Sequence, residues 1–321
     1  MSERQSPTLS FLKPVLELEE RINNLSYMIK YKPIYLAKEL IMLRNRLEEV
    51  KKDIFVALTP LQRLNLVRQA DRPTTLDYVQ YLFDDWIELH GDRGGTDDTA
   101  LVGGIGRFNS QTVVFIGHQR GKDTKDNVLR NFGMPSPGGY RKALRLMSHA
   151  NRFNFPILTF IDTPGAWAGI EAEKLGQGEA IAVNLREMFS FNVPIICTVI
   201  GEGGSGGALG IGVGDSVLML EHAVYTVATP EACAAILWKD SKLSKEAAEA
   251  LKITASDLKI LDIIDEIVTE PVGGAQLDPL QASIHLKKIL KMELARLCSL
   301  SSKELKDLRY KKFRGIGSFY E

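Results

Sequence analysis

Two glycine-rich segments are the part of this sequence best suited to chemistry. DTPGAWAG (162–169) and GEGGSGGALGIGVGD (201–215) each continue from a run of β-branched and aliphatic residues, so each lies where a buried strand ends. Glycine and alanine leave backbone N–H groups accessible. One well-aimed backbone donor stabilises a negatively charged oxygen in a transition state by about 3 kcal/mol. The two segments therefore predict an oxyanion site made of backbone amides.

The predicted donors lie in two loops that can converge. Gly206 and Gly207 follow the second strand and open the next helix, where unpaired N–H groups favour a developing negative charge. Gly165 and Ala166 offer further amides in the first loop. For one such loop alone, a tight turn with close packing explains the glycines equally well. Two loops after two neighbouring strands favour a site.

The same glycines also permit a different enzyme. Gly203-x-Ser205-x-Gly207 matches the nucleophile elbow of serine hydrolases, in which Ser205 would attack and a histidine would act as the base. Glycines on both sides position Ser205 poorly, and His222 and His285 are the only histidines downstream. A hydrolase remains the second hypothesis. The Asp162–Gly165 segment also mimics the DxxG of GTPases, but the sequence lacks a phosphate-binding loop.

A basic stretch lies between the first predicted strands. Such side chains could attract an acidic carrier protein or a phosphate-bearing substrate, and a solvated loop is the alternative for each of them. His118 sits just past a strand end and is the most site-like histidine, whereas the other four look structural or solvated. The basic residues are Arg120, Lys122, Lys125, Arg130, Arg141, Lys142 and Arg145.

Composition excludes several other classes of protein. The 321 residues carry 40 basic and 40 acidic side chains, so the overall charge does not indicate nucleic acid or an anionic membrane as a partner. The three cysteines form no CxxC pair that would bind zinc. The sequence shows neither a signal peptide nor an apolar run of about 18 residues. We expect a cytoplasmic protein with no metal site of its own.

Hydrophobic periodicity supplies the elements that position the loops. Apolar residues recur every three or four positions over 15–25 and 36–54, which predicts a helical hairpin or an arm that docks on a partner chain. Short β-branched runs alternating with helical segments predict repeated βαβ units between 76 and 275. We therefore divide the chain into an N-terminal helical segment (1–75), a core (76–275) and a C-terminal helical tail (276–321). The predicted strands cover 113–117, 157–162, 195–200 and 217–220, and capping signals begin helices at Thr59-Pro60, Thr229-Pro230 and Ser301 with Glu304.

A colinear series of motifs resembles the alpha subunit family of the carboxyltransferase of bacterial and plastid acetyl-CoA carboxylases. The resemblance implies an α/β fold of the crotonase-like (ClpP/crotonase) type, a spiral of ββα units with an N-terminal helical hairpin and C-terminal helices. This chain has Trp167-Ala168 where the family usually reads DTPGAYPG, and we expect the difference to alter loop stiffness or the biotin contact but not the reaction. Besides the two glycine loops, the motifs are RPTTLDYVQ (72–80), NFGMPSPGGYRKALRLM (131–147), EACAAILWK (231–239), EPVGGA (270–275) and LRYKKF (308–313).

The resemblance also implies a reaction and partners. Carboxybiotin on a biotin carboxyl carrier protein would donate its carboxyl group to acetyl-CoA and give malonyl-CoA for fatty acid synthesis, while a separate biotin carboxylase consumes ATP. A beta subunit would carry the CoA site and a four-cysteine zinc module, in an alpha2beta2 core. Carried over by motif, Gly206 and Gly207 become the donors for the biotin ureido oxyanion, supported by Gly203, Gly204 and the first loop. The sequence leaves open which base deprotonates acetyl-CoA and whether transfer is concerted or stepwise.

Overall fold

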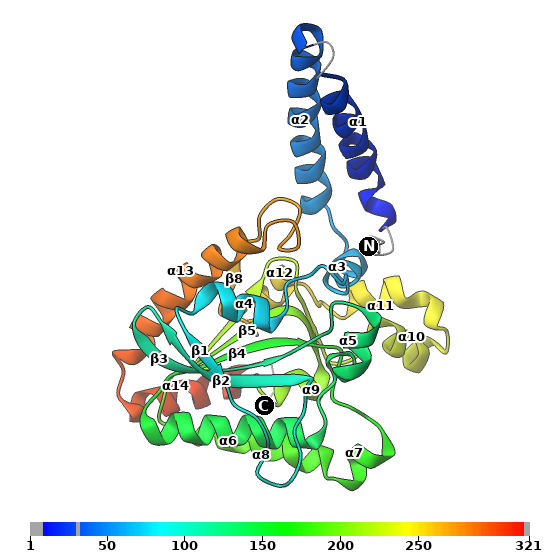
Figure 1. The fold of residues 1–321 in the computed structure, drawn as a ribbon. Coiled ribbons are helices and arrows are strands. Elements are labelled where there is room, and N and C mark those ends of the chain that lie inside the picture. The colour runs from blue at the N-terminus through cyan, green and yellow to red at the C-terminus, as the bar shows by residue number, and fades with distance from the viewer. Residues whose placement is uncertain (1–8, 30–32, 318–321) are drawn as a thin grey trace.

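An eight-stranded mixed β-sheet forms the centre of the computed structural model, which describes residues 9–29 and 33–317 (Figure 1). The strand order is β1-β2-β3-β4-β5-β6-β8, with β7 paired to the far end of β5. β1 to β3 are antiparallel, and β3, β4, β5, β6 and β8 run parallel. The strands are β1 (Trp86–Glu88), β2 (Leu101–Phe108), β3 (Gln111–His118), β4 (Ile157–Thr163), β5 (Ile195–Gly204), β6 (Ser216–Leu220), β7 (Val224–Thr226) and β8 (Glu266–Val268).

The four strands expected from the sequence form the interiors of β3, β4, β5 and β6. Every residue of β4 and β5 is buried, as expected for parallel strands covered on both faces. One boundary was wrong: β5 does not end at Ile200 but continues to Gly204, because its last residues pair with β7 and with Thr163. Periodicity did not indicate β1, β2, β7 or β8, which are short or rich in glycine.

Helices cover both faces of the sheet (Figure 1). α6 and α8 lie along one face, and α4 and α13 lie along the other. α14 packs against α8, and α13 and α14 place leucines in the same hydrophobic core as the strands. The covering helices are α4 (Thr75–Leu82), α6 (Pro137–Phe153), α8 (Gln177–Ser190), α13 (Pro279–Cys298) and α14 (Ser302–Gly315).

The predicted N-terminal hairpin is confirmed and stands out from the rest of the molecule (Figure 1). It consists of α1 (Lys13–Ile29) and α2 (Pro33–Val56), which pack through a small cluster centred on Val15, Ile22 and Leu47. α3 (Pro60–Val67) connects the hairpin to the core and begins with a capping box between Thr59 and Gln62. The sequence predicted this start because threonine caps and proline occupies the first helical position.

Short helices fill the connections between the strands. The caps predicted at Thr229 and Ser301 are confirmed, because each side chain accepts a hydrogen bond from the first turn of its helix. Among the described residues, no helix is long and apolar enough to cross a membrane. The remaining helices are α5 (Thr124–Leu129), α7 (Ile170–Lys174), α9 (Ser205–Leu209), α10 (Pro230–Trp238), α11 (Ser244–Ala250) and α12 (Ala255–Ile260), with 3₁₀ turns at Ser10–Leu12, Asn131–Gly133 and Ser241–Leu243.

Candidate active site

The two predicted glycine loops meet at the carboxyl ends of β4 and β5. A Cβ atom at Gly207 would lie 2.5 Å from both the Ala166 nitrogen and the Gly165 carbonyl carbon, so only glycine fits there. A side chain at Gly204 would collide with the Pro164 carbonyl oxygen. The structure thus brings together residues that lie about 40 positions apart in the sequence. Their lack of side chains is what allows the two backbones to touch.

Three backbone donors are available where the loops meet. Within the described part of the chain, the N–H groups of Gly206, Gly207 and Ala166 donate no hydrogen bond. The Gly165 N–H, by contrast, is bound to Thr163 Oγ1 at 3.1 Å and serves the turn. Space is open beside Gly206, where the nearest atom to a Cβ would be Ile181 Cδ1 at 3.8 Å. An anionic oxygen could therefore approach the Gly206 N–H.

The helix that carries two of these donors is short. α9 has only five residues, so its dipole contributes little and the individual N–H groups carry the electrostatic effect. Its first residue, Ser205, adopts a positive φ of 46°, a conformation that is uncommon outside glycine. This sharp change of direction turns the chain from β5 into α9 and aims the following amides.

The histidines needed by a serine hydrolase are engaged elsewhere. His222 Nδ1 lies 2.7 Å from Arg63 Nη1. His285 contacts Gln281 and the Thr269 carbonyl oxygen. Within the described residues, Ser205 has no hydrogen bond to a histidine. The serine hydrolase hypothesis is therefore not supported.

His118, the most site-like histidine of the sequence, lies beneath the loops and is fully buried. Burial lowers its pKa to about 3, and the backbone carbonyls of Gly207 and Phe160 offset this only partly. Its Nδ1 accepts a long hydrogen bond from the Asp162 N–H at 3.4 Å, and Nε2 has no hydrogen-bond partner in the described structure. His118 is therefore neutral at physiological pH and is inaccessible as a base.

A buried ion network supports the strand ends. Glu202 accepts hydrogen bonds from Arg68 at 2.6 and 3.0 Å and from Arg120 at 2.9 Å. Asp162 lies 3.1 Å from Arg120 Nε and accepts the Glu202 N–H, because Gly201 leaves room for its carboxylate. Burial raises the pKa of Asp162. Burial also opposes the ionisation of Glu202, but the hydrogen bonds and charges of Arg68 and Arg120 outweigh burial and lower the pKa of Glu202.

This network borders a cavity of about 300 Å³. The arginines that line it are already paired, Arg68 and Arg120 with Glu202 and Asp162 and Arg72 with Glu270, so their charges are balanced within the protein. The network holds the ends of β4 and β5 in register, directly behind the glycine loops. Sequence reasoning placed Arg120 in a loop and attached no role to Glu202, because ion pairs between distant segments leave no trace in spacing.

Most residues of the basic stretch neutralise the protein's own groups. Arg120, Lys122, Arg130, Arg141 and Lys142 each pair with a carboxylate. Arg145 donates to the Gly91 and His90 carbonyl oxygens. These contacts favour a structural role over the attraction of an acidic carrier or a phosphate. Lys125 is the one residue of this set with no such contact recorded in the described structure.

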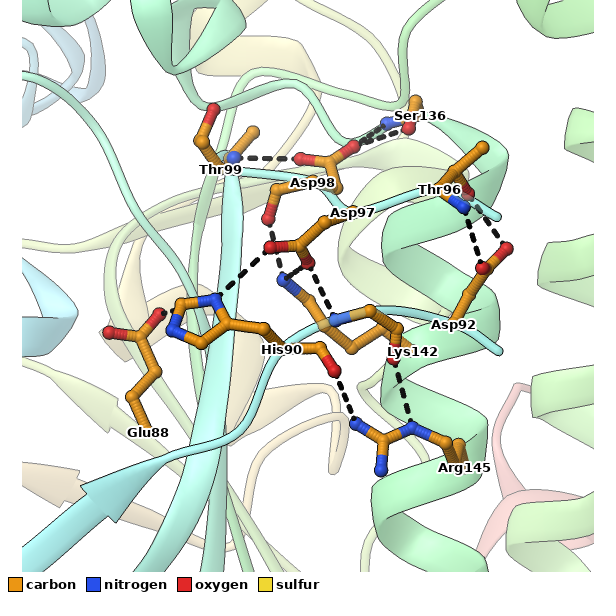
Figure 2. Close-up of polar contacts among 12 residues, drawn as sticks. Glu88, His90, Asp92, Thr96, Asp97, Asp98, Thr99, Ser136, Lys142 and Arg145 are labelled. Carbon is orange, nitrogen blue, oxygen red and sulfur yellow. Dashed lines mark hydrogen bonds and ion pairs between the residues drawn. The ribbon is translucent and has the colours of Figure 1, made fainter. Parts of the chain in front are cut away.

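Three of these basic residues fasten α6 to the 90–98 loop, as Figure 2 shows in part. Lys142 is buried and reaches Asp97 Oδ1 at 2.5 Å and the Asp98 carbonyl oxygen at 2.7 Å. Asp98 also accepts the backbone N–H of Ser136 at 2.6 Å, at the start of α6 (Figure 2). A carboxylate at this position stabilises a helix N-terminus. The loop therefore fixes where α6 begins.

An apolar pocket of about 290 Å³ opens beside α9. Ser205, Leu209 and Gly212 form one side, and α12 and α14 contribute the other. Leu209 and Val227 of this lining are exposed, and so are large apolar side chains in the first glycine loop, on and after α7, and on α10. They are Trp167, Ile170, Leu175, Leu209, Val227, Ile236, Leu237 and Trp238.

The sequence matches one protein family over nearly its whole length. Residues 8–317 match the family described as acetyl co-enzyme A carboxylase carboxyltransferase-like. The chain is 72% identical to the acetyl-coenzyme A carboxylase carboxyl transferase subunit alpha of Antithamnion sp., with 100% of each chain covered. It is 69% identical to the protein of the same name from Gracilaria tenuistipitata var. liui, covering 100% of this chain and 98% of that protein.

Solved structures with low sequence identity share the fold. The transcarboxylase 12S structure aligns with a TM-score of 0.58 and 18% identity, over 70% of this chain and 41% of that chain. The Pseudomonas malonate decarboxylase hetero-dimer aligns with a TM-score of 0.57 and 17% identity, over 74% of this chain and 97% of that chain. These structures confirm the crotonase-like fold that the sequence motifs implied.

Proposed function

The chain belongs to the family of acetyl-CoA carboxylase carboxyltransferase alpha subunits, and from that premise we propose how its glycine loops take part in the reaction. It is a component of a carboxyltransferase that transfers a carboxyl group to acetyl-CoA, and malonyl-CoA is the product used in fatty acid synthesis. We propose which residues stabilise the transition state, that N-carboxybiotin is the carboxyl donor, and which partner chains complete the enzyme.

We assign the stabilisation of an oxyanion to the N–H groups of Gly206 and Gly207. When the carboxyl group leaves N-carboxybiotin, negative charge develops on the ureido oxygen of biotin. The observation that carries this assignment is the pair of unbonded N–H groups at the start of α9, beside open space at Gly206. Each donor is expected to stabilise the transition state by about 3 kcal/mol. Backbone donors need no change of protonation, which suits a site whose nearest histidine stays neutral.

The other glycines shape this site. The free Ala166 N–H faces the same junction and is a third candidate donor, whereas Gly165 forms the turn that presents it. Gly204 allows the Pro164 carbonyl to approach β5, and Gly203 leaves room for the ring of Tyr225. Replacing these glycines would separate the loops. Their contribution to the reaction is therefore to place the donors.

We propose that a second chain completes the active site. The described residues around α9 offer backbone donors and an apolar pocket, and large apolar side chains on α7 and α10 are exposed to solvent. Ile170 is 72% exposed and Ile236 is 68% exposed. A partner surface would cover such side chains, because exposed apolar side chains are often buried where protein chains meet. The partner would be a beta subunit with the CoA site and a zinc module, in an alpha2beta2 core served by the carrier protein and biotin carboxylase.

A reducing aqueous compartment fits the cysteines. Cys197, Cys233 and Cys298 are all free thiols, and Cys298 is exposed. An oxidising environment would place an exposed thiol at risk of pairing with other molecules. We therefore keep the expectation that the chain works in the cytoplasm or in an equivalent reducing interior.

Reconstitution tests the divided site. The purified chain, the beta subunit and their mixture would each be supplied with acetyl-CoA and carboxylated carrier protein, and malonyl-CoA would be measured. We expect no turnover with either subunit alone and turnover with the mixture. Turnover by this chain alone would contradict the divided site. An active mixture in which Gly206→Ala has no effect would remove the proposed oxyanion donors while leaving the subunit arrangement intact.

A further inference from the structure

The Gly207 carbonyl is held from behind by a buried tyrosine. Tyr140 lies in the first turn of α6, is fully buried, and donates from its hydroxyl to the Gly207 oxygen at 3.0 Å. The contact joins two segments that are 67 residues apart. The nearest atom to a Cβ at Gly206 belongs to Ile181, not to Tyr140. Tyr140 therefore contacts the helix of the donors from within the protein interior.

A glycine makes room for this tyrosine. A Cβ atom at Gly210 would lie 2.5 Å from Cε1 and 2.7 Å from Cδ1 of the Tyr140 ring. Asn184 on α8 then bridges the same two residues, because its Nδ2 donates to the Tyr140 carbonyl at 3.1 Å and to the Gly210 carbonyl at 3.0 Å. The carbonyls of Gly207, in the middle of the short helix, and of Gly210, just after it, are thus both held by side chains.

The front of α9 is fixed just as closely. Gly207 lies against the Ala166 nitrogen and the Gly165 carbonyl carbon. A helix of five residues that starts from the positive φ of Ser205 has too few hydrogen bonds of its own to set its direction. Contacts from outside must determine where its amides point. The Tyr140 hydroxyl donates a hydrogen bond to the Gly207 carbonyl at 3.0 Å, and the buried His118 ring also interacts with this carbonyl.

The position of Tyr140 depends in turn on how the start of α6 is held. Asp98 accepts both the N–H and the hydroxyl of Ser136, the residue that precedes α6. A side chain at Gly139 would press on the same carboxylate, at 3.1 Å. The Asp98–Ser136 contacts, which Figure 2 shows, therefore attach the start of α6 to the 90–98 loop. Tyr140 lies in the first turn of this helix.

We propose that Tyr140 is a positioning residue for carboxyl transfer, whose hydroxyl holds the Gly207 peptide so that the amides of α9 point at the developing oxyanion. This role rests on the proposed function of Gly206 and Gly207. Without the hydroxyl, the buried Gly207 carbonyl loses the Tyr140 hydrogen bond, and α9 can rotate to seek a replacement. A displacement of about 1 Å near a reacting centre costs about 100-fold in rate, so a partial rotation predicts a loss of about 10- to 100-fold.

The test compares two buried tyrosines in the reconstituted two-subunit enzyme. Tyr140→Phe removes the hydroxyl that binds Gly207. Tyr78→Phe is the matched control, because Tyr78 is equally buried and its hydroxyl has no hydrogen-bond partner in the described structure. The measurements are kcat and the KM values for acetyl-CoA and for carboxylated carrier protein, together with Tm and the size of the complex.

We expect kcat of Tyr140→Phe to fall at least tenfold while both KM values stay within about twofold of the parent, because only transition-state interactions are lost. Tyr78→Phe should keep the parental kcat. A kcat within twofold of the parent for Tyr140→Phe overturns the inference, even if Tm falls, because that result would describe a purely structural residue. If Tyr140→Phe fails to assemble, Asn184→Ala replaces it, and a parental kcat of that variant overturns the inference.

Gly206→Ala in the same assay separates this inference from the function on which it rests. Loss of turnover in Gly206→Ala with parental turnover in Tyr140→Phe rejects the positioning role alone. Parental turnover in both variants rejects the oxyanion donors themselves. Loss of turnover in both, with Tyr78→Phe unaffected, supports both proposals.

Discussion

The guanidinium of Arg72 forms a two-point salt bridge with Glu270, with distances of 2.6 and 2.8 Å, although 198 residues separate them. Both side chains are buried, and Arg72 also donates to the Ile200 carbonyl at 2.9 Å. Two sequence motifs of no evident chemistry, RPTTLDYVQ and EPVGGA, thus meet behind β5. Their charges hold the strand that leads into the site.

Breaking this pair should destabilise the chain. Glu270→Gln leaves the Arg72 charge buried without a counter-charge, which costs about 3 kcal/mol or more. The free energy of unfolding from urea titration at neutral pH measures the loss. Glu266→Gln serves as the control, because Glu266 is exposed on β8 and has no recorded ion pair. Equal stability of the two variants would contradict a structural role for the pair.

The same pair predicts a dependence of stability on pH. Burial alone would raise the pKa of Glu270, but the Arg72 charge and hydrogen bonds outweigh it and lower the pKa from 4.5 to about 2. A carboxyl group with a lowered folded-state pKa stabilises the fold above its unfolded pKa. That contribution, about 3 kcal/mol, is lost as the pH falls from about 4.5 toward about 2. The stability difference between the parent and Glu270→Gln should shrink over this range, and a constant difference would refute the assignment.

Ser205→Ala should retain most of the carboxyltransferase activity. The Ser205 hydroxyl has no histidine partner in the described structure, and the proposed donors are the amides that follow it. We expect turnover of the reconstituted complex within about threefold of the parent, because the substitution removes a hydroxyl that takes no part in the proposed reaction and leaves the backbone donors in place. A loss of several orders of magnitude, together with labelling of the parent by a serine-directed phosphonate, would revive the nucleophile elbow.

Gly206 and Gly207 should respond differently to substitution. A methyl group at Gly206 projects into open space, so Gly206→Ala should lower turnover by about 10²-fold by blocking the approach of the oxyanion, with little change in Tm. A side chain at Gly207 meets the Ala166 nitrogen at 2.5 Å, so Gly207→Val should lower turnover and also Tm by pushing the loops apart. Malonyl-CoA formation and thermal melting distinguish the two effects. Parental turnover of Gly207→Val would show that the Gly207 N–H is not one of the oxyanion donors.

The sequence by itself determined the local structure and the family. β-Branched runs predicted the interiors of β3, β4, β5 and β6, because strands buried on both faces must be apolar throughout. Periodic leucines predicted α1 and α2, and threonine and serine caps predicted the starts of α3, α10 and α14. The glycine loops also indicated backbone donors, because a run of glycines after a strand can be recognised from consecutive residues alone.

Only the tertiary structure decided which distant residues meet. The pairs Tyr140 with Gly207, Arg72 with Glu270 and Asp98 with Ser136 come from separate elements, and no spacing rule connects them. Glu202 is a further example. It belongs to β5 because this end of the strand pairs with β7, and its own strand propensity would not have predicted that. Local sequence sets which backbone conformations are favourable. Contacts across the sheet select among them, because a short helix such as α9 takes its orientation from the elements that pack around it.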